Sequence, residues 1–165
     1  MRTSSVFSTA IIAALVVATV GCGNSDEKAK KSARQTATSV ANRVEKATRL
    51  KATLSGATEV PSGDPDGTGT TTVNLDVTKR QVCYEVTVQK IDHPVGMHIH
   101  EGEAGKSGSI VLPLTTPAAS DTTTTGCADA DAGLIARMAA NPGGFYLNVH
   151  SDAYPQGAVR GQLSQ

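Results

Sequence analysis

Three of the four histidines in this 165-residue chain fall in two short segments of alternating character. The first segment holds His98 and His100, and the second, about fifty residues later, holds Asn148 and His150. Side chains two residues apart on a β-strand point to the same face. His98 therefore shares a face with His100, and Asn148 shares a face with His150. We expect the two segments to be neighbouring strands that bring the three histidines together.

Two kinds of chemistry fit this cluster. Neutral imidazoles are good ligands for copper and zinc, and three of them would leave one coordination position open for redox or hydrolytic chemistry. Asn148 would then be a hydrogen-bond partner of a ligand. Alternatively, the histidines form a structural polar cluster, satisfied by Asn148, by Glu101 or by the backbone. The sequence leaves both interpretations open.

The other residues that could take part in chemistry give weaker indications of function. His93 precedes Pro94 and is expected to be exposed in a loop. Arg160 alternates with Gln162, and a half-buried guanidinium needs a partner, so we expect a pair with a carboxylate such as Glu59 or Glu101. No nucleophile elbow or phosphate-binding loop is present. We assign no catalytic residue, and the sequence favours a protein that is not an enzyme.

The N-terminus predicts export. Arg2 precedes an apolar run over residues 6–20, which is too short for a membrane-spanning helix. The run ends at Gly21-Cys22, which resembles a bacterial lipobox, although Thr19 stands where leucine is usual. We therefore predict a signal peptide over residues 1–21 and acylation of Cys22, which would anchor the protein in a membrane facing outside the cytoplasm. The alternative is a plain secretory signal with a chance cysteine.

The cysteine count agrees with this interpretation. The chain has three cysteines, so lipidation of Cys22 would leave one pair, Cys83 and Cys127. Two thiols outside the cytosol normally pair. They could instead bind a metal, but they lie in no close-spaced cysteine pattern, so the sequence favours a disulfide.

Charge divides the chain in two. Residues 22–50 carry seven basic and three acidic side chains, whereas residues 51–165 carry seven basic and twelve acidic ones. We interpret residues 22–49 as a linker that is disordered or partly helical. The acidic, aromatic-poor remainder argues against nucleic acid as a partner, because such binding needs a basic surface.

Residues 50–165 predict an all-β domain. About seven segments alternate between polar and apolar side chains with turn signals between them, which indicates an antiparallel, Greek-key-like sandwich or barrel. We expect strands at residues 51–55, 69–78, 81–89, 97–100, 109–112, 145–150 and 158–163. One short helix follows Cys127, capped by Asp129 or Asp131. Its apolar stripe consists of Leu134, Ile135 and Met138.

Six motifs over about residues 50–165 resemble the chordin-type (CHRD) domain. They are Ala52-Thr53-Leu54-Ser55-Gly56, Glu59-Val60-Pro61, Gly67-Thr68-Gly69, His98-Ile99-His100-Glu101-Gly102, Asn148-Val149-His150-Ser151 and Pro155-Gln156-Gly157-Ala158-Val159-Arg160-Gly161-Gln162-Leu163. In animal chordin these domains belong to an extracellular antagonist of growth factors, and in bacteria they occur on secreted proteins and lipoproteins. The resemblance implies a binding or structural role, but the growth-factor role does not transfer to a bacterial lipoprotein.

A second resemblance is local. Residues 97–101 are similar to the histidine-X-histidine strand of copper/zinc superoxide dismutases, in which both histidines bind copper. His98 and His100 are the matching positions. The chain shows no counterpart to that family's zinc-binding loop, and no certain counterpart to its catalytic arginine. The similarity implies a metal site and lends little support to dismutase activity.

The sequence thus predicts first a membrane-anchored, extracytoplasmic CHRD domain with a binding or structural role. The first alternative is a copper- or zinc-binding metalloprotein that uses His98, His100 and His150. The second alternative is an interaction module for another envelope protein, which would need an exposed edge or apolar patch but no metal.

Overall fold

The computed structural model describes residues 23–118 and 122–165. The predicted signal peptide and Cys22 lie outside this part of the chain. The chain divides into two units, residues 1–37 and residues 38–165. Of the first unit, the structure describes residues 23–37.

The predicted linker is helical. Residues 23–48 form one continuous helix, α1 (Gly23–Thr48), because alanine, lysine, arginine and glutamate, all strong helix formers, are frequent in it. A helix of 26 residues extends about 39 Å. The side chains of residues 27–39 are exposed to solvent. Within the described part of the chain, no helix is both long and apolar enough to cross a membrane.

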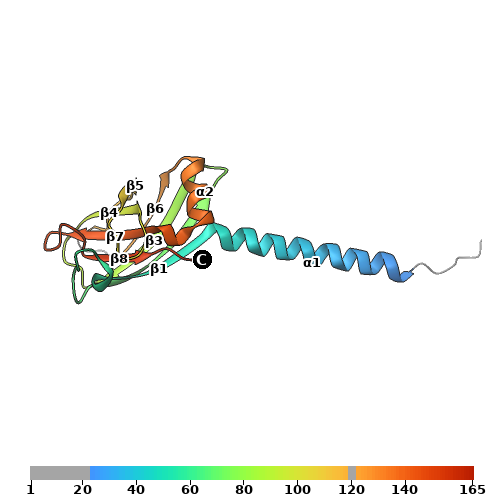
Figure 1. Ribbon diagram of the computed structural model, residues 1–165, viewed down its shortest axis with the longest axis horizontal. Coiled ribbons are helices and arrows are strands. Elements are labelled where there is room, and N and C mark those ends of the chain that lie inside the picture. Colours follow the sequence, from blue (N-terminus) through green and yellow to red (C-terminus); the bar gives the residue numbers. More distant parts are fainter. Residues whose placement is uncertain (1–22, 119–121) are drawn as a thin grey trace, which may run out of the picture. The chain divides into compact units, whose positions relative to one another are not determined.

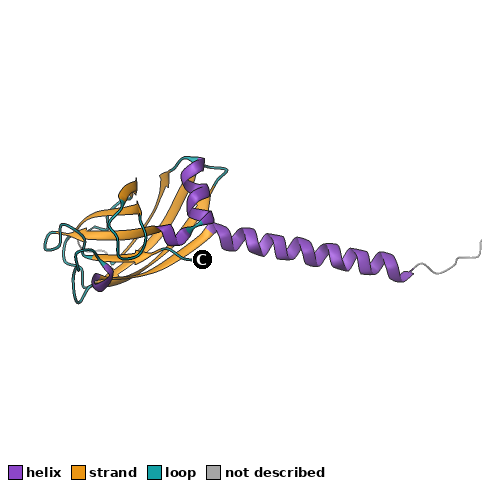
Figure 2. Cartoon of the chain, in the orientation of Figure 1, coloured by secondary structure: helices purple, strands orange, loops and turns teal. Residues whose placement is uncertain are grey.

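The prediction of an antiparallel all-β domain is confirmed. Eight strands form one sheet in the order β5-β4-β7-β8-β1-β2-β3-β6, and this sheet curls into a nearly closed barrel (Figure 2). The strands are β1 (Arg49–Ser55), β2 (Thr68–Asp76), β3 (Gln81–Gln89), β4 (Pro94–Glu101), β5 (Ser109–Pro113), β6 (Thr123–Asp129), β7 (Phe145–Ser151) and β8 (Val159–Gln162). Some strands that are neighbours in the sheet, such as β4 and β7, are far apart in sequence, as is typical of Greek-key connections.

The expected number of strands was one too low. The missed strand is β6, which pairs with β3 at one edge of the sheet. Its sequence, Thr-Thr-Thr-Gly-Cys-Ala-Asp, has no alternation of apolar side chains, because no side chain of this edge strand is fully buried. A smaller correction concerns the end of the strand expected over residues 69–78. The strand ends at Asp76, and Val77 is 54% exposed.

The core lies on the inner face of the curled sheet. Alternate residues of β1, β2 and β3 are buried, as the sequence predicts. Helix α2 (Ala132–Ala140) lies at one end of the strands (Figure 1) and buries the predicted stripe of Leu134, Ile135 and Met138. Of the two caps considered, Asp131 is the one used: its carboxylate accepts a hydrogen bond from the Leu134 N–H.

The outer face of β4, β7 and β8 is also covered. The loop over residues 102–108, here called the covering loop, hydrogen-bonds to this face at several points. Arg160 donates to the carbonyls of Glu103 and Lys106, and the Gln162 amide donates to the Gly102 carbonyl. Strand β7 is therefore buried on both faces over most of its length. The predicted polar cluster lies on this covered outer face.

The predicted disulfide joins Cys83 to Cys127. The two residues are direct cross-strand partners in the β3–β6 ladder. The bond therefore fastens the edge strand β6 to the sheet, and its loop spans a sequence separation of 44 residues. Both sulfur atoms are used in this bond, which removes the alternative that the two cysteines are metal ligands.

We expect the Cys83→Ser/Cys127→Ser variant to lose about 4 kcal/mol of unfolding free energy, because the open chain gains conformational entropy in the unfolded state. Urea denaturation of the oxidised protein and the variant measures this difference. Reducing the wild-type protein should give the same loss, and a reductant should leave the variant unchanged. Equal stability of oxidised and reduced wild type would contradict the expectation.

Candidate metal centre

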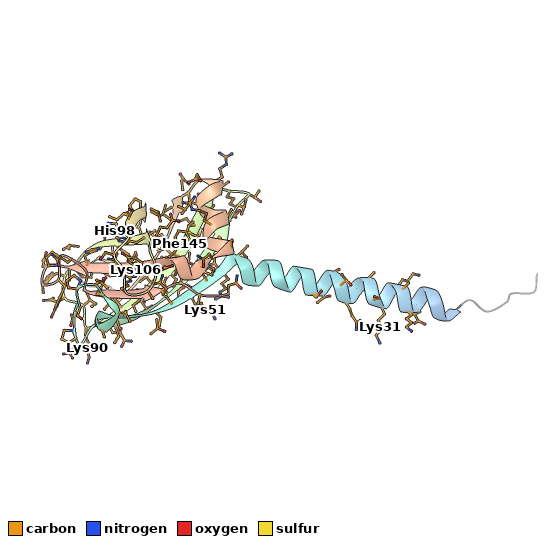
Figure 3. The ribbon with its side chains drawn as sticks, in the orientation of Figure 1. Lys31, Lys51, Lys90, His98, Lys106 and Phe145 are labelled. Carbon is orange, nitrogen blue, oxygen red and sulfur yellow. A yellow bond between two sulfur atoms is a disulfide. The ribbon has the colours of Figure 1, made fainter. Side chains whose placement is uncertain are left out.

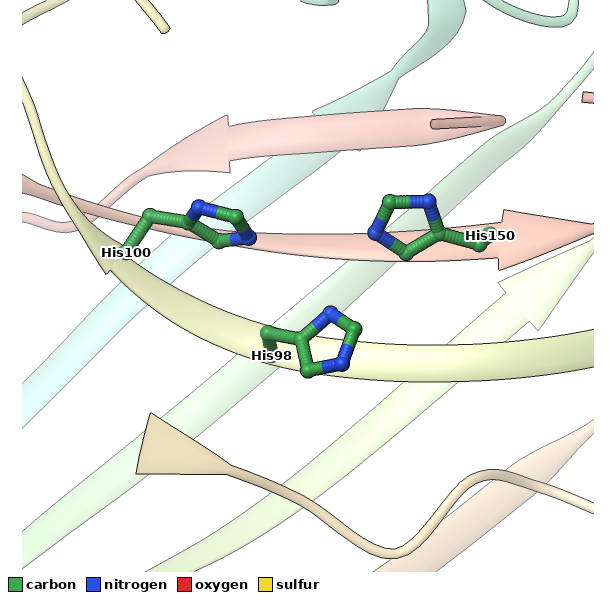
Figure 4. A group of neighbouring side chains, drawn as sticks. All are labelled: His98, His100 and His150. Carbon is green, nitrogen blue, oxygen red and sulfur yellow. The ribbon is translucent and has the colours of Figure 1, made fainter. Parts of the chain in front are cut away.

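The β4–β7 ladder brings the three predicted histidines together. Gly96 pairs with His150, and His98 pairs with Asn148. The His98 ring centroid lies 5.7 Å from that of His100 and 5.1 Å from that of His150. Figure 4 shows the three rings turning nitrogen atoms toward a common space, and Figure 3 labels His98 within the domain. One ligand nitrogen from each ring lies within 4.8 Å of the others.

These distances are close to those of a metal site. An ion bound at about 2.1 Å from each nitrogen, in tetrahedral geometry, would hold the nitrogens about 3.4 Å apart. Modest rotations of the rings would close the difference. The ring of His98 is only partly buried and can adjust most. His150 is also partly buried but is held by one hydrogen bond, and His100 is 8% exposed and held from both sides.

Two backbone carbonyls orient the rings of His100 and His150. Nδ1 of His100 lies 3.0 Å from the Gly108 carbonyl, and Nδ1 of His150 lies 3.0 Å from the Pro155 carbonyl. A carbonyl can only accept, so in each ring Nδ1 carries the proton and donates it. In the neutral imidazole this leaves the lone pair on Nε2. Metal-binding histidines are commonly held in this way, with the second ring nitrogen donating to a carbonyl.

Two of the three nitrogens that point inward lack partners. Nδ1 of His98 and Nε2 of His150 are buried and have no hydrogen-bond partner among the described residues. Nε2 of His100 lies 3.1 Å from Oδ1 of Asn148. In the neutral ring, the Nε2 lone pair and the amide oxygen are both acceptors, and they face each other. A cation between them would satisfy both, and so would turning the amide so that its NH₂ group donates to Nε2. The alternative of a fully hydrogen-bonded polar cluster thus accounts for His100 but leaves His98 and His150 unexplained.

Burial affects the charge of the cluster. The pKa of His98 lies below its ordinary value, first because burial disfavours the charged ring and then because His150 and His100 would repel it. A neutral imidazole is the form that binds a metal ion. The His98 ring therefore remains neutral, and able to bind a metal ion, at a lower pH than the ring of an exposed histidine.

Arg160 does not form the expected ion pair with Glu59 or Glu101. Glu101 instead accepts hydrogen bonds from Arg137. The guanidinium of Arg160 donates to covering-loop carbonyls and lies 3.3 Å from the centroid of the Tyr146 ring. The sequence did not reveal this arrangement because the acceptors are backbone atoms of a loop more than fifty residues away.

Tyr146 is a residue of the centre that sequence reasoning missed. Its ring stacks on the His100 ring at a centroid distance of 4.7 Å, and its hydroxyl accepts a hydrogen bond from the Gly108 N–H. The two-residue spacing of Tyr146, Asn148 and His150 was the available signal, because all three share one face of β7. His93 is exposed, as expected, and pairs with Asp92.

Comparison with known families agrees with this architecture. The profile of the CHRD domain matches residues 50–163, which is more than half of the chain. The chain belongs to the CHRD family. The matched part of the CHRD domain includes β4 and β7 and therefore all three histidines. No curated protein matches the chain. The local similarity to copper/zinc superoxide dismutases stays a prediction.

The lowered pKa of His98 predicts a pH dependence of stability in metal-free buffer. Between the folded-state pKa and the unfolded-state value of about 6.5, the unfolded chain binds a proton that the folded chain does not. The unfolding free energy should therefore rise with pH through this window and fall as the solution is acidified. Urea denaturation with a chelator present, at several pH values below 7, measures the slope.

The matched controls are two single variants. His98→Gln should flatten the slope in this window, whereas His93→Gln, which alters an exposed histidine, should leave it unchanged. Identical slopes in the wild type and His98→Gln would show that His98 does not titrate differently in the two states.

Proposed function

We propose that this CHRD domain binds one copper or zinc ion through Nδ1 of His98, Nε2 of His100 and Nε2 of His150. The observation that carries the proposal is the pair of buried inward-facing nitrogens without partners, on His98 and His150. A buried polar atom without a hydrogen bond costs about 1–3 kcal/mol. A bound ion would remove that cost at both positions.

The choice of metal follows from the donor set. The three donors are imidazole nitrogens, which suit copper and zinc better than calcium or magnesium. At a nitrogen site Cu²⁺ binds more tightly than Zn²⁺. We therefore expect both ions to bind, copper more tightly. The coarser conclusion, that the chain carries a CHRD domain suited to a binding or structural role, does not depend on the metal.

Metal should stabilise the folded protein by mass action. At a free concentration about 100 times Kd, Cu²⁺ or Zn²⁺ should raise Tm by roughly 10 °C, equivalent to about 2.7 kcal/mol. His98→Ala, His100→Ala and His150→Ala should each abolish the rise. Scanning calorimetry with and without metal, on protein without a histidine tag, measures the difference for each variant.

The control is His93→Ala, which should respond to metal as the wild type does. A structural cluster would give another pattern: the three substitutions would lower Tm in metal-free buffer, and metal would leave the wild-type Tm unchanged. That pattern would exclude the metal site and favour the binding or structural role without an ion.

We further propose that the protein is anchored in a membrane through an acylated Cys22 and faces outside the cytoplasm. The apolar run over residues 6–20 and the Gly21-Cys22 ending support this proposal. The disulfide agrees with it, because such bonds persist outside the cytosol. An envelope protein as a partner of the domain remains a prediction.

The anchor can be tested by detergent partitioning. Protein from its native membrane should enter the detergent phase, and Cys22→Ala should remove it from that phase or block processing of the signal peptide. Ser25→Ala, a substitution close to the modified residue, serves as the control and should partition as the wild type does. A Cys22→Ala protein that is still acylated and membrane-bound would refute the anchor.

A further inference from the structure

The proposed metal centre has no negative charge of its own. Among the described residues, the group that could hold an ion consists of His98, His100 and His150, with no carboxylate among its members. Three neutral ligands around a divalent ion would leave the full charge of the ion uncompensated in a partly buried place.

Three acidic residues of the neighbouring elements make contacts away from the centre. Glu101, at the end of β4, forms an ion pair with Arg137 of α2. Glu103, in the covering loop, pairs with Lys106. The Oε2 atom of the buried Glu59 accepts a hydrogen bond from the Val60 N–H, and its Oε1 has no partner among the described residues. In these contacts, all three carboxylates interact with groups outside the metal centre.

A buried cation adds to the positive potential. The Arg160 guanidinium lies over one face of the Tyr146 ring, and the His100 ring is stacked on Tyr146. Arg160 is 2% exposed, and its hydrogen bonds go to the carbonyls of Glu103 and Lys106 and to the Gln162 side-chain oxygen. All these acceptors are neutral, so the charge of Arg160 is solvated by dipoles and persists in the neighbourhood of the centre.

Gly96 lies beside two of the three rings of the centre. A Cβ atom at this position would lie 3.4 Å from Cε1 of His98 and 3.6 Å from Cδ2 of His150. These are ordinary van der Waals distances, so a small side chain at residue 96 would fit and would cover both rings. Glycine therefore leaves room for at least a methyl group beside these two rings, at the less buried end of the cluster.

We propose that the coordination position left open by the three histidines binds a small monovalent inorganic anion, which approaches over Gly96. This inference rests on the proposed metal function and specifies the ligand class of the same site. The anion would supply the missing negative charge in a partly buried site, where the attraction to the ion is stronger than in bulk water.

Azide is the probe for this site. The wild-type protein is loaded with one Cu²⁺ per chain, and the stoichiometry is measured before azide is added. We expect azide to produce a charge-transfer absorption band and a changed electron paramagnetic resonance spectrum, both saturating at one azide per copper. Copper-loaded protein whose spectra do not change in a large excess of azide would overturn the anion site and leave the metal site standing.

A matched pair of substitutions tests the role of charge. Gly96→Asp would place a carboxylate beside His98 and His150, and Gly96→Asn would place a neutral group of the same size there. We expect Gly96→Asp to weaken azide binding about tenfold or more relative to Gly96→Asn, because its carboxylate replaces the anion. Equal azide affinity in the two variants would show that charge does not select the ligand.

The outcomes separate the two proposals. A wild-type protein that fails to bind Cu²⁺ refutes the metal centre and the anion site together. A protein that binds Cu²⁺ but not azide refutes the anion site alone. If a Gly96 variant does not retain copper, the wild-type azide titration still decides whether the anion site exists.

Discussion

The outer face of this domain depends on the burial of one guanidinium group, that of Arg160. Removing such a cation from water costs several kcal/mol unless its N–H groups find acceptors. The covering loop supplies two carbonyls, and Tyr146 supplies the face of its ring. Satisfying Arg160 therefore requires the loop to lie over β7 and β8. With the loop in this position, the Gly108 carbonyl reaches His100.

The centre has one rigid end and one adaptable end. At the rigid end, His100 is held by the Gly108 carbonyl, by Asn148 and by the ring of Tyr146. At the other end, His98 and His150 are partly exposed and next to a glycine. A ligand set fixed at one end can bind an ion with little loss of conformational entropy there, while the other end adjusts to the geometry of the ion.

Much of this architecture could be predicted because it follows from local alternation. The spacing of His98 and His100 placed them on one face, and the cysteine count predicted the bond between Cys83 and Cys127. Strand β6 could not be predicted, because its position comes from its partner β3 and not from any apolar pattern of its own. The prediction of carboxylate partners for Arg160 was wrong, because side-chain identity does not show which backbone carbonyls a distant loop presents.

Two of the proposed ligands lie two residues apart on β4, but the third comes from a strand about fifty residues later. His150 meets the others only after β4 and β7 have paired in the observed register, and a slip of one residue would turn it to the inner face. Pairing strands so distant in sequence is slow, because the loop must close before contacts compensate for its entropy. An ion at this site would therefore bind only after these two strands had paired. Its binding would report that the strands have reached the observed register.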